Sequence, residues 1–89
     1  MAHLFFAASI QRHIAMPERE VAVRSVAEAL AAAFAEEPRL RGYILDDQGG
    51  LRKHLSIFVD GNPVRDRRYL TDAVHGDSRI YVVQALSGG

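Results

Sequence analysis

One amphipathic helix set between two groups of strands is the feature that most constrains the fold of this chain. Ser25 is followed by Glu28, the spacing at which each side chain can accept a hydrogen bond from the other residue's backbone N–H at a helix start. Apolar residues then recur every three or four positions up to Glu36, and Pro38 stops the helix because the residue before a proline avoids the α region. The pattern predicts one helix over residues 25–36.

Most other apolar residues fall into short runs that are typical of β-strands. Residues 4–10 are apolar and aromatic-rich, which predicts a central strand buried on both faces. A hairpin would join this run to an alternating, half-exposed strand over residues 20–24. Residues 55–59 alternate clearly, residues 60–63 (Asp-Gly-Asn-Pro) predict a tight turn, and a final strand is expected over residues 79–86.

Strands on both sides of one helix predict an α+β roll, in which a mixed sheet of four or five strands carries the main helix across one face. Because the helix acts as a crossover, the last strand can lie beside the first and parallel to it. Residues 39–50 add only a short helix or strand and a loop. We expect one domain over residues 1–84, a flexible C-terminal tail over residues 85–89, and a common core of Val26, Leu30, Phe34, Leu55, Ile57, Val59, Ile80 and Val82.

Composition argues against several classes of function. Eleven basic residues balance eleven acidic ones, so no net field would attract nucleic acid or an anionic membrane, and no apolar run is long enough to span a bilayer. The chain has no cysteine, its serines lack the context of a catalytic nucleophile, and no glycine-rich phosphate loop joins a strand to a helix. We therefore expect no catalytic residues, no bound cofactor and, because the start lacks a secretory signal, a cytoplasmic location. No metal site is expected either, because the four histidines lack ligand spacing: His3, His13, His54 and His75.

The sequence ends in Ser87-Gly88-Gly89, and this diglycine suggests that the chain end is a substrate. Neither Gly88 nor Gly89 has a Cβ, so both can adopt almost any φ and ψ and pass through a narrow enzyme tunnel. A terminal carboxylate is a poor electrophile until it is converted to a mixed anhydride, usually by adenylation with ATP. The alternative interpretation is a frayed terminus without a role.

Strand alternation also predicts a partner-binding patch on the uncovered face of the sheet. If Leu55 and Ile57 face the helix, then Phe58, Tyr81 and Val83 point to the opposite face, where a one-helix fold has nothing to cover them. An exposed aromatic patch suggests a protein partner. The alternative is that these are scattered surface residues or lie under a loop.

Three stretches together resemble the MoaD/ThiS family of ubiquitin-like β-grasp sulfur carriers. Residues 57–64 (Ile-Phe-Val-Asp-Gly-Asn-Pro-Val) are similar to the family's hydrophobic strand and turn, and residues 76–78 (Gly-Asp-Ser) followed by Ile80 are similar to its later turn. The third stretch is the terminal diglycine. Residues 51–59 also resemble the branch that carries sulfur for cysteine synthesis. The resemblance spans essentially the whole chain and implies the ubiquitin-like β-grasp fold.

The resemblance implies that the chain is a protein co-substrate rather than an enzyme. An E1-like enzyme would use ATP to adenylate the carboxylate of Gly89, and the product would become a thiocarboxylate that supplies sulfur to a biosynthetic enzyme. Two alternatives stay open: a ubiquitin-like modifier joined through Gly89 to lysines, and a non-covalent β-grasp adaptor. Many family members have a proline before the tail, where this chain has residues 84–87 (Gln-Ala-Leu-Ser), so the pathway that receives the sulfur is also open.

Overall fold

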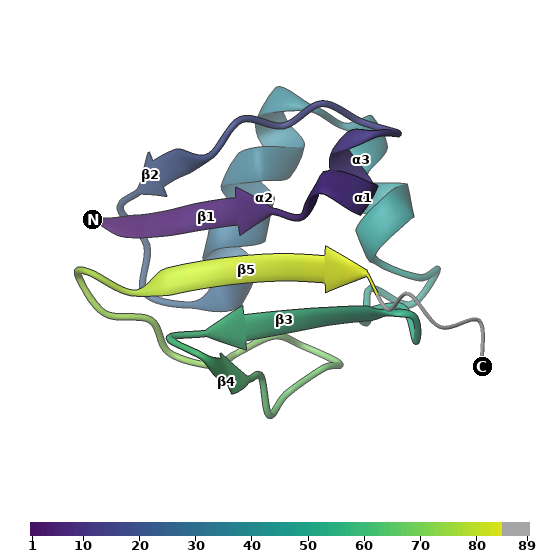
Figure 1. Ribbon diagram of the computed structural model, residues 1–89. Coiled ribbons are helices and arrows are strands. Elements are labelled where there is room, and N and C mark those ends of the chain that lie inside the picture. Colours follow the sequence, from purple (N-terminus) through teal and green to yellow (C-terminus); the bar gives the residue numbers. More distant parts are fainter. Residues whose placement is uncertain (85–89) are drawn as a thin grey trace.

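The protein folds around one five-stranded sheet. The computed structural model describes residues 1–84, and the strands stand in the order β2-β1-β5-β3-β4 (Figure 1). Strands β1 and β5 are parallel, and every other neighbouring pair is antiparallel. The predicted parallel pairing of the first and last strands is therefore confirmed. The strands are β1 (Ala2–Phe6), β2 (Arg19–Val21), β3 (Leu55–Val59), β4 (Asn62–Pro63) and β5 (Arg79–Gln84).

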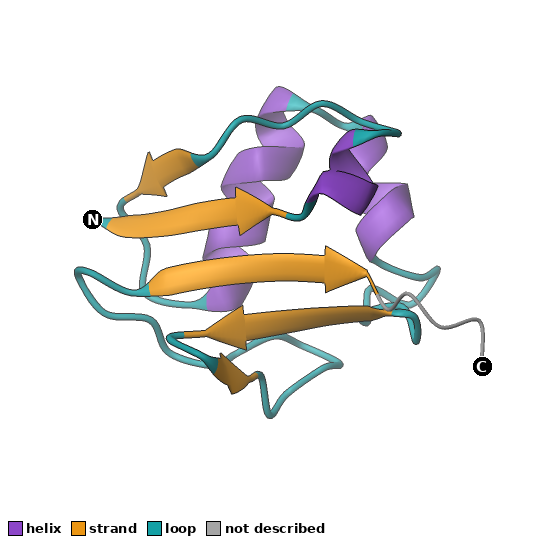
Figure 2. Ribbon diagram, viewed as in Figure 1, coloured by secondary structure: helices purple, strands orange, loops and turns teal. Residues whose placement is uncertain are grey.

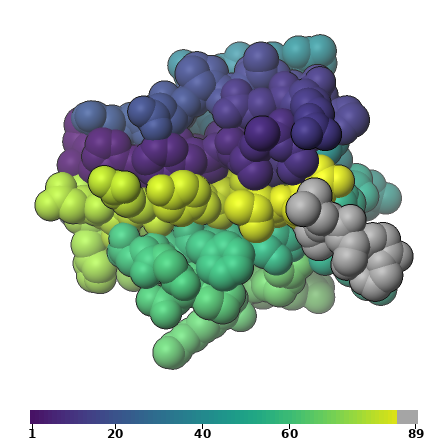
Figure 3. Space-filling model, in the orientation of Figure 1, coloured from purple at the N-terminus to yellow at the C-terminus, as the bar shows by residue number. Residues whose placement is uncertain are grey.

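One long helix packs on the sheet. Helix α2 (Val26–Glu36) runs across one face, whereas the shorter α1 (Ala8–Gln11) follows β1 and α3 (Arg39–Ile44) follows α2 (Figure 2). The opposite face is open over β1, β5 and β3, which lie side by side in Figure 3. The predicted α+β roll, with a mixed sheet and one main helix, is confirmed.

Helix α2 begins at the predicted cap, but one of the two expected hydrogen bonds is different. Ser25 is the N-cap, and its Oγ accepts a hydrogen bond from the backbone N–H of Glu28 at 3.2 Å. The carboxylate of Glu28 accepts from the backbone N–H of Arg24 at 2.8 Å rather than from that of Ser25. A β-bridge between Ser25 and Ala73 holds the chain extended before the helix, and Arg24 is then the donor that faces the carboxylate. The helix ends at Glu36, as predicted.

The core lies between α2 and the inner face of the sheet. Six of the eight predicted core residues are buried: Val26, Leu30, Leu55, Ile57, Ile80 and Val82. The prediction was wrong for Phe34 and Val59, which pack against the core but are only half-buried. Phe34 lies at the edge of the helix face, beside a surface groove, and Val59 ends β3 next to the edge strand β4. The core also includes Leu40 and Ile44 of α3 and Leu70, for which the sequence pattern gave only weak signals.

The predicted first strand over residues 4–10 is wrong at its end and in its burial. Strand β1 stops at Phe6, and the chain turns into α1, where Ile10 is buried and the side-chain amide of Gln11 donates to the Phe6 carbonyl at 3.0 Å. The partner strand β2 pairs only with Ala2 to Leu4, so little of the sheet extends past Phe6 on that side. Burial alternates along β1, so only one face is buried.

The second strand is also shorter than the predicted 20–24. Strand β2 ends at Val21 because Val21 pairs with Ala2, the first residue of β1, and the following residues have no strand beside them. The link from β1 to β2 contains α1 and is not a simple hairpin. The turn after β3 lies within the predicted residues 60–63 but is shorter, because Asn62 and Pro63 already form β4. Asp60 and Gly61 both have positive φ, at 52° and 85°, as a two-residue type I′ turn requires.

Candidate functional site

The end of β5, which leads toward the diglycine, is held by three neighbouring elements. Gln84 pairs with Leu55 of β3, and its side-chain oxygen accepts a hydrogen bond from the Tyr43 hydroxyl at 2.8 Å. The backbone N–H of Ala7, just after β1, donates to the Val82 carbonyl at 2.9 Å. Strand β5 is therefore fixed as far as its last residue. The sequence-predicted site residues Gly88 and Gly89 lie outside the described residues.

An aromatic row crosses the open face of the sheet. Tyr81 of β5 pairs with Phe5 of β1 on one side and with Phe58 of β3 on the other, so the three side chains point to the same face. The rings of Phe5 and Tyr81 stack with centroids 4.7 Å apart, and the His3 ring lies 6.3 Å beyond Phe5. Tyr81 is 38% exposed. We call this set, with Val83, the outer patch: His3, Phe5, Phe58, Tyr81 and Val83.

The sheet thus brings together the three residues that were predicted for the patch. Phe58 and Val83 are half-buried and Tyr81 is exposed, and the strand register puts all three on the open face of the sheet. Phe5 and His3 were not predicted for this patch, because the apolar run over residues 4–10 is typical of a strand buried on both faces. One feature of the sequence does indicate this face: polar His3 stands two residues before Phe5, so both side chains lie on the same, exposed face of the strand.

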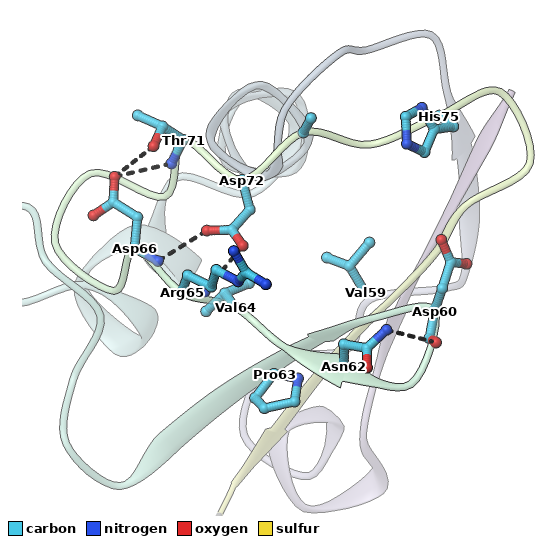
Figure 4. A pocket seen from close by; sticks show the side chains of 11 residues that line it. Val59, Asp60, Asn62, Pro63, Val64, Arg65, Asp66, Thr71, Asp72 and His75 are labelled. Carbon is cyan, nitrogen blue, oxygen red and sulfur yellow. Dashed lines mark hydrogen bonds between the residues drawn. The ribbon is translucent and has the colours of Figure 1, made fainter.

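A surface depression of about 1050 Å³ has apolar residues in its lining together with polar groups that hold the local backbone together (Figure 4). The Asp66 carboxylate accepts hydrogen bonds from the Thr71 hydroxyl at 2.6 Å and from the backbone N–H of Tyr69 at 2.9 Å. These bonds, the one from the Thr71 side chain first, hold the pKa of Asp66 below its usual value. Asp72 accepts from the backbone N–H groups of Arg65 and Asp66. These carboxylates organise the loops around the depression.

Other kinds of site find no support in the described part of the chain. Within residues 1–84, no three His, Asp or Glu side chains lie together in a way that could hold a metal ion. None of the helices described is long and apolar enough to cross a membrane. The outer patch and the end of β5 are the features that bear on the function predicted from the sequence.

Known proteins resemble this chain in structure, at low sequence identity. No protein-family model matches the chain, and no curated protein is similar to it in sequence. A chain of the Amycolatopsis orientalis BexX/CysO complex superposes with a TM-score of 0.82 at 14% identity, covering 100% of both chains. CysO from Mycobacterium tuberculosis gives 0.80 at 13% identity, covering 97% of this chain and 100% of that one. SAMP1 from Haloferax volcanii gives a TM-score of 0.77 at 20% identity, covering 99% of this chain and 98% of that one.

These similarities extend over whole chains, so they compare complete domains rather than a shared motif. The strand order and the single long helix are those of the fold that the sequence resemblance implied. At sequence identities of 13% to 20%, structural similarity shows that the fold is shared. The chain has the ubiquitin-like β-grasp fold that it shares with these small proteins.

Proposed function

We propose that this chain is a cytoplasmic sulfur carrier whose Gly89 carboxylate is adenylated by an E1-like enzyme and converted to a thiocarboxylate. One observation carries the proposal: a diglycine follows the central strand of a β-grasp domain after only Ala85, Leu86 and Ser87. The CysO neighbour, whose complex with BexX is among the similar structures, supports a role that depends on a protein partner. The chain would act as a co-substrate, and a biosynthetic enzyme would accept the sulfur.

The proposed chemistry needs only a carboxylate from this chain. A Gly89 oxygen attacks the α-phosphorus of ATP, the bond to pyrophosphate breaks, and an acyl-adenylate forms. Hydrosulfide then attacks the acyl carbon, AMP leaves with the oxygen, and a thiocarboxylate remains, with no net oxidation or reduction. The activating enzyme would bind ATP, since no glycine-rich loop among residues 1–84 joins a strand to a helix N-terminus.

A ubiquitin-like modifier is the second candidate, and the similar structures of small archaeal modifier protein 1 favour it. The same acyl-adenylate would lead to an amide bond with a lysine of another protein. Lys53 is the sole lysine of this chain and is exposed, so it offers the one side-chain amine for linking one copy to the next.

The intact mass of the chain distinguishes these functions. For this measurement, a tag is added at the N-terminus, so that Gly89 stays free, and the tagged chain is purified from its native host. We expect a fraction of the molecules to show the mass gain of an oxygen-to-sulfur exchange, localised to Gly89 by fragmentation. A ladder of larger conjugates would instead establish the modifier. An unmodified chain that no host adenylating enzyme activates with ATP would leave the non-covalent adaptor and refute the carrier.

The outer patch is expected to bind the activating enzyme. Phe58→Ala and Tyr81→Ala should each weaken that binding by roughly 30-fold, because buried aromatic anchors commonly contribute about 2 kcal/mol at such interfaces. A binding titration measures the effect, and circular dichroism checks that each variant is folded. Tyr69→Ala is the matched control, since Tyr69 is exposed but is not part of the outer patch. Equal affinity for all variants would show that the enzyme binds elsewhere.

A further inference from the structure

A small apolar groove of about 190 Å³ lies on the helical side of the molecule. Helix α2 contributes Leu30 and Phe34, the residue after α3 contributes Leu45, and a later loop contributes Tyr69 and Leu70. This volume is several times the ~30 Å³ that a water molecule occupies in the liquid, so the groove has room for one large apolar side chain. We call it the Tyr69 groove.

Tyr69 is held in an exposed position at the rim of this groove. Its side chain is 67% exposed, whereas that of the next residue, Leu70, is 3% exposed and packs in the core. Leu70 has a φ of 56°, in the left-handed region that a leucine rarely adopts. This backbone directs Leu70 inward and leaves Tyr69 outside, so the loop maintains an exposed aromatic ring at a conformational cost.

Hydrogen bonds fix the loop to α2 without any partner. The first two N–H groups of the helix, those of Val26 and Ala27, donate to the carbonyls of Asp72 and Leu70 at 3.1 and 2.9 Å. On the loop itself, the Asp66 carboxylate binds Thr71 and the backbone N–H of Tyr69 (Figure 4 shows the bonds to Thr71). Helix α2 and the loop with Tyr69, which form two sides of the groove, are thus joined before any ligand binds. This pre-organisation lowers the entropy cost of binding.

The charged side chain that lines the groove and the one that contacts its Tyr69 ring are both cationic. Among the described residues that line it, Arg41 is the charged one, and it is exposed. A second cation lies at the rim: the Arg68 guanidinium stands 5.6 Å from the centre of the Tyr69 ring, and its Nε donates to the Tyr69 hydroxyl at 3.2 Å. The nearby Asp46 carboxylate already accepts from the backbone N–H groups of Gln48 and Gly50. A complementary ligand would therefore be apolar at its centre and acidic beside it.

We propose that the Tyr69 groove binds a protein segment that presents one large apolar side chain next to carboxylates. The apolar side chain enters between Phe34 and Tyr69, and the carboxylates pair with Arg41 and Arg68. Helix α2 lies on the face of the sheet opposite the outer patch, so the two surfaces can hold different partners at the same time (Figure 2). This proposal does not depend on activation of Gly89.

A peptide titration followed by amide NMR of the full chain tests the proposal. The probe is acetyl-Gly-Asp-Phe-Asp-Gly-amide, and the matched peptides carry lysine in place of aspartate or alanine in place of phenylalanine. We expect saturable shifts confined to α2, the end of α3 and residues 68–71, with the acidic phenylalanine peptide alone. Added salt should weaken this binding, because exposed ion pairs are screened.

Variants of the chain make the test specific. Tyr69→Ala should reduce the affinity for the acidic peptide by about tenfold through loss of an aromatic anchor, and Arg41→Gln should reduce it several-fold. Tyr81→Ala, on the outer patch, should leave it unchanged. The proposal is overturned if no shift occurs up to the solubility limit of the peptide, if the lysine peptide binds equally well, or if the shifts fall on the outer patch.

Discussion

Adding one residue after Gly89 is expected to abolish ATP-dependent activation of this chain. The proposed reaction requires a free carboxylate at Gly89, and an added residue converts that carboxylate to an amide, whose oxygen cannot form the acyl-adenylate. Pyrophosphate release with the cognate adenylating enzyme should fall to the level without the chain. The domain over residues 1–84 is unchanged in this variant, so thermal unfolding should be the same as that of the native chain.

Gly88→Val tests the shape of the tail while keeping the carboxylate free. A branched side chain restricts φ and adds bulk next to the reacting group. Misplacing a reacting atom by about 1 Å can slow a reaction about 100-fold, and we expect a loss of that order in pyrophosphate release. Ser87→Ala is the matched control, because it removes one hydroxyl and adds no bulk. If the extended chain and the Gly88→Val variant are both activated as well as the native chain, the diglycine is not the reacting group.

Leu30→Ala is expected to reduce the free energy of unfolding by about 3 kcal/mol or more. Leu30 is 1% exposed and lies midway along α2, so its truncation removes buried apolar surface and leaves a cavity. Urea denaturation measures the loss. Phe34→Ala should cost less, because the Phe34 side chain is half-buried and borders the Tyr69 groove.

The two substitutions together test which face of α2 packs on the sheet. If Leu30→Ala costs under about 1 kcal/mol, or if Phe34→Ala costs more than Leu30→Ala, the helix is rotated relative to the arrangement described above. Should Leu30→Ala fail to fold, Leu30→Val tests the burial of Leu30 at a smaller loss, because a single methylene group is removed.

The parts of the fold that could be predicted depend on residues close together in the sequence. The cap at Ser25 and the turn at Asp60 and Gly61 are decided within about four residues, so their side chains carry the information. Where a strand ends is decided by its neighbours. Strand β2 stops at Val21 because β1 begins at Ala2, and no pattern within residues 20–24 records that limit.

In the candidate site, too, features set by nearby residues could be predicted and features set by distant elements could not. Alternation along β3 and β5 was enough to place Phe58 and Tyr81 on one face, because period 2 is a local property. Phe5 was missed since its run continues into α1, a change of structure that depends on the short β2. The exposed position of Tyr69 could not be predicted, because it follows from hydrogen bonds between its loop and a helix that begins at Val26, far earlier in the chain.

The central position of β5 determines when this protein can fold. Before residues 79–84 are available, β1 with β2 and β3 with β4 are separate two-stranded units, which are at best marginally stable in water. Pairing β1 with β5 must close a loop of most of the chain, and such long-range pairing makes folding slow. Strand β5 also aligns Phe5, Tyr81 and Phe58. A partner that recognises the outer patch therefore binds only chains whose synthesis has passed β5, and it does not recognise truncated products.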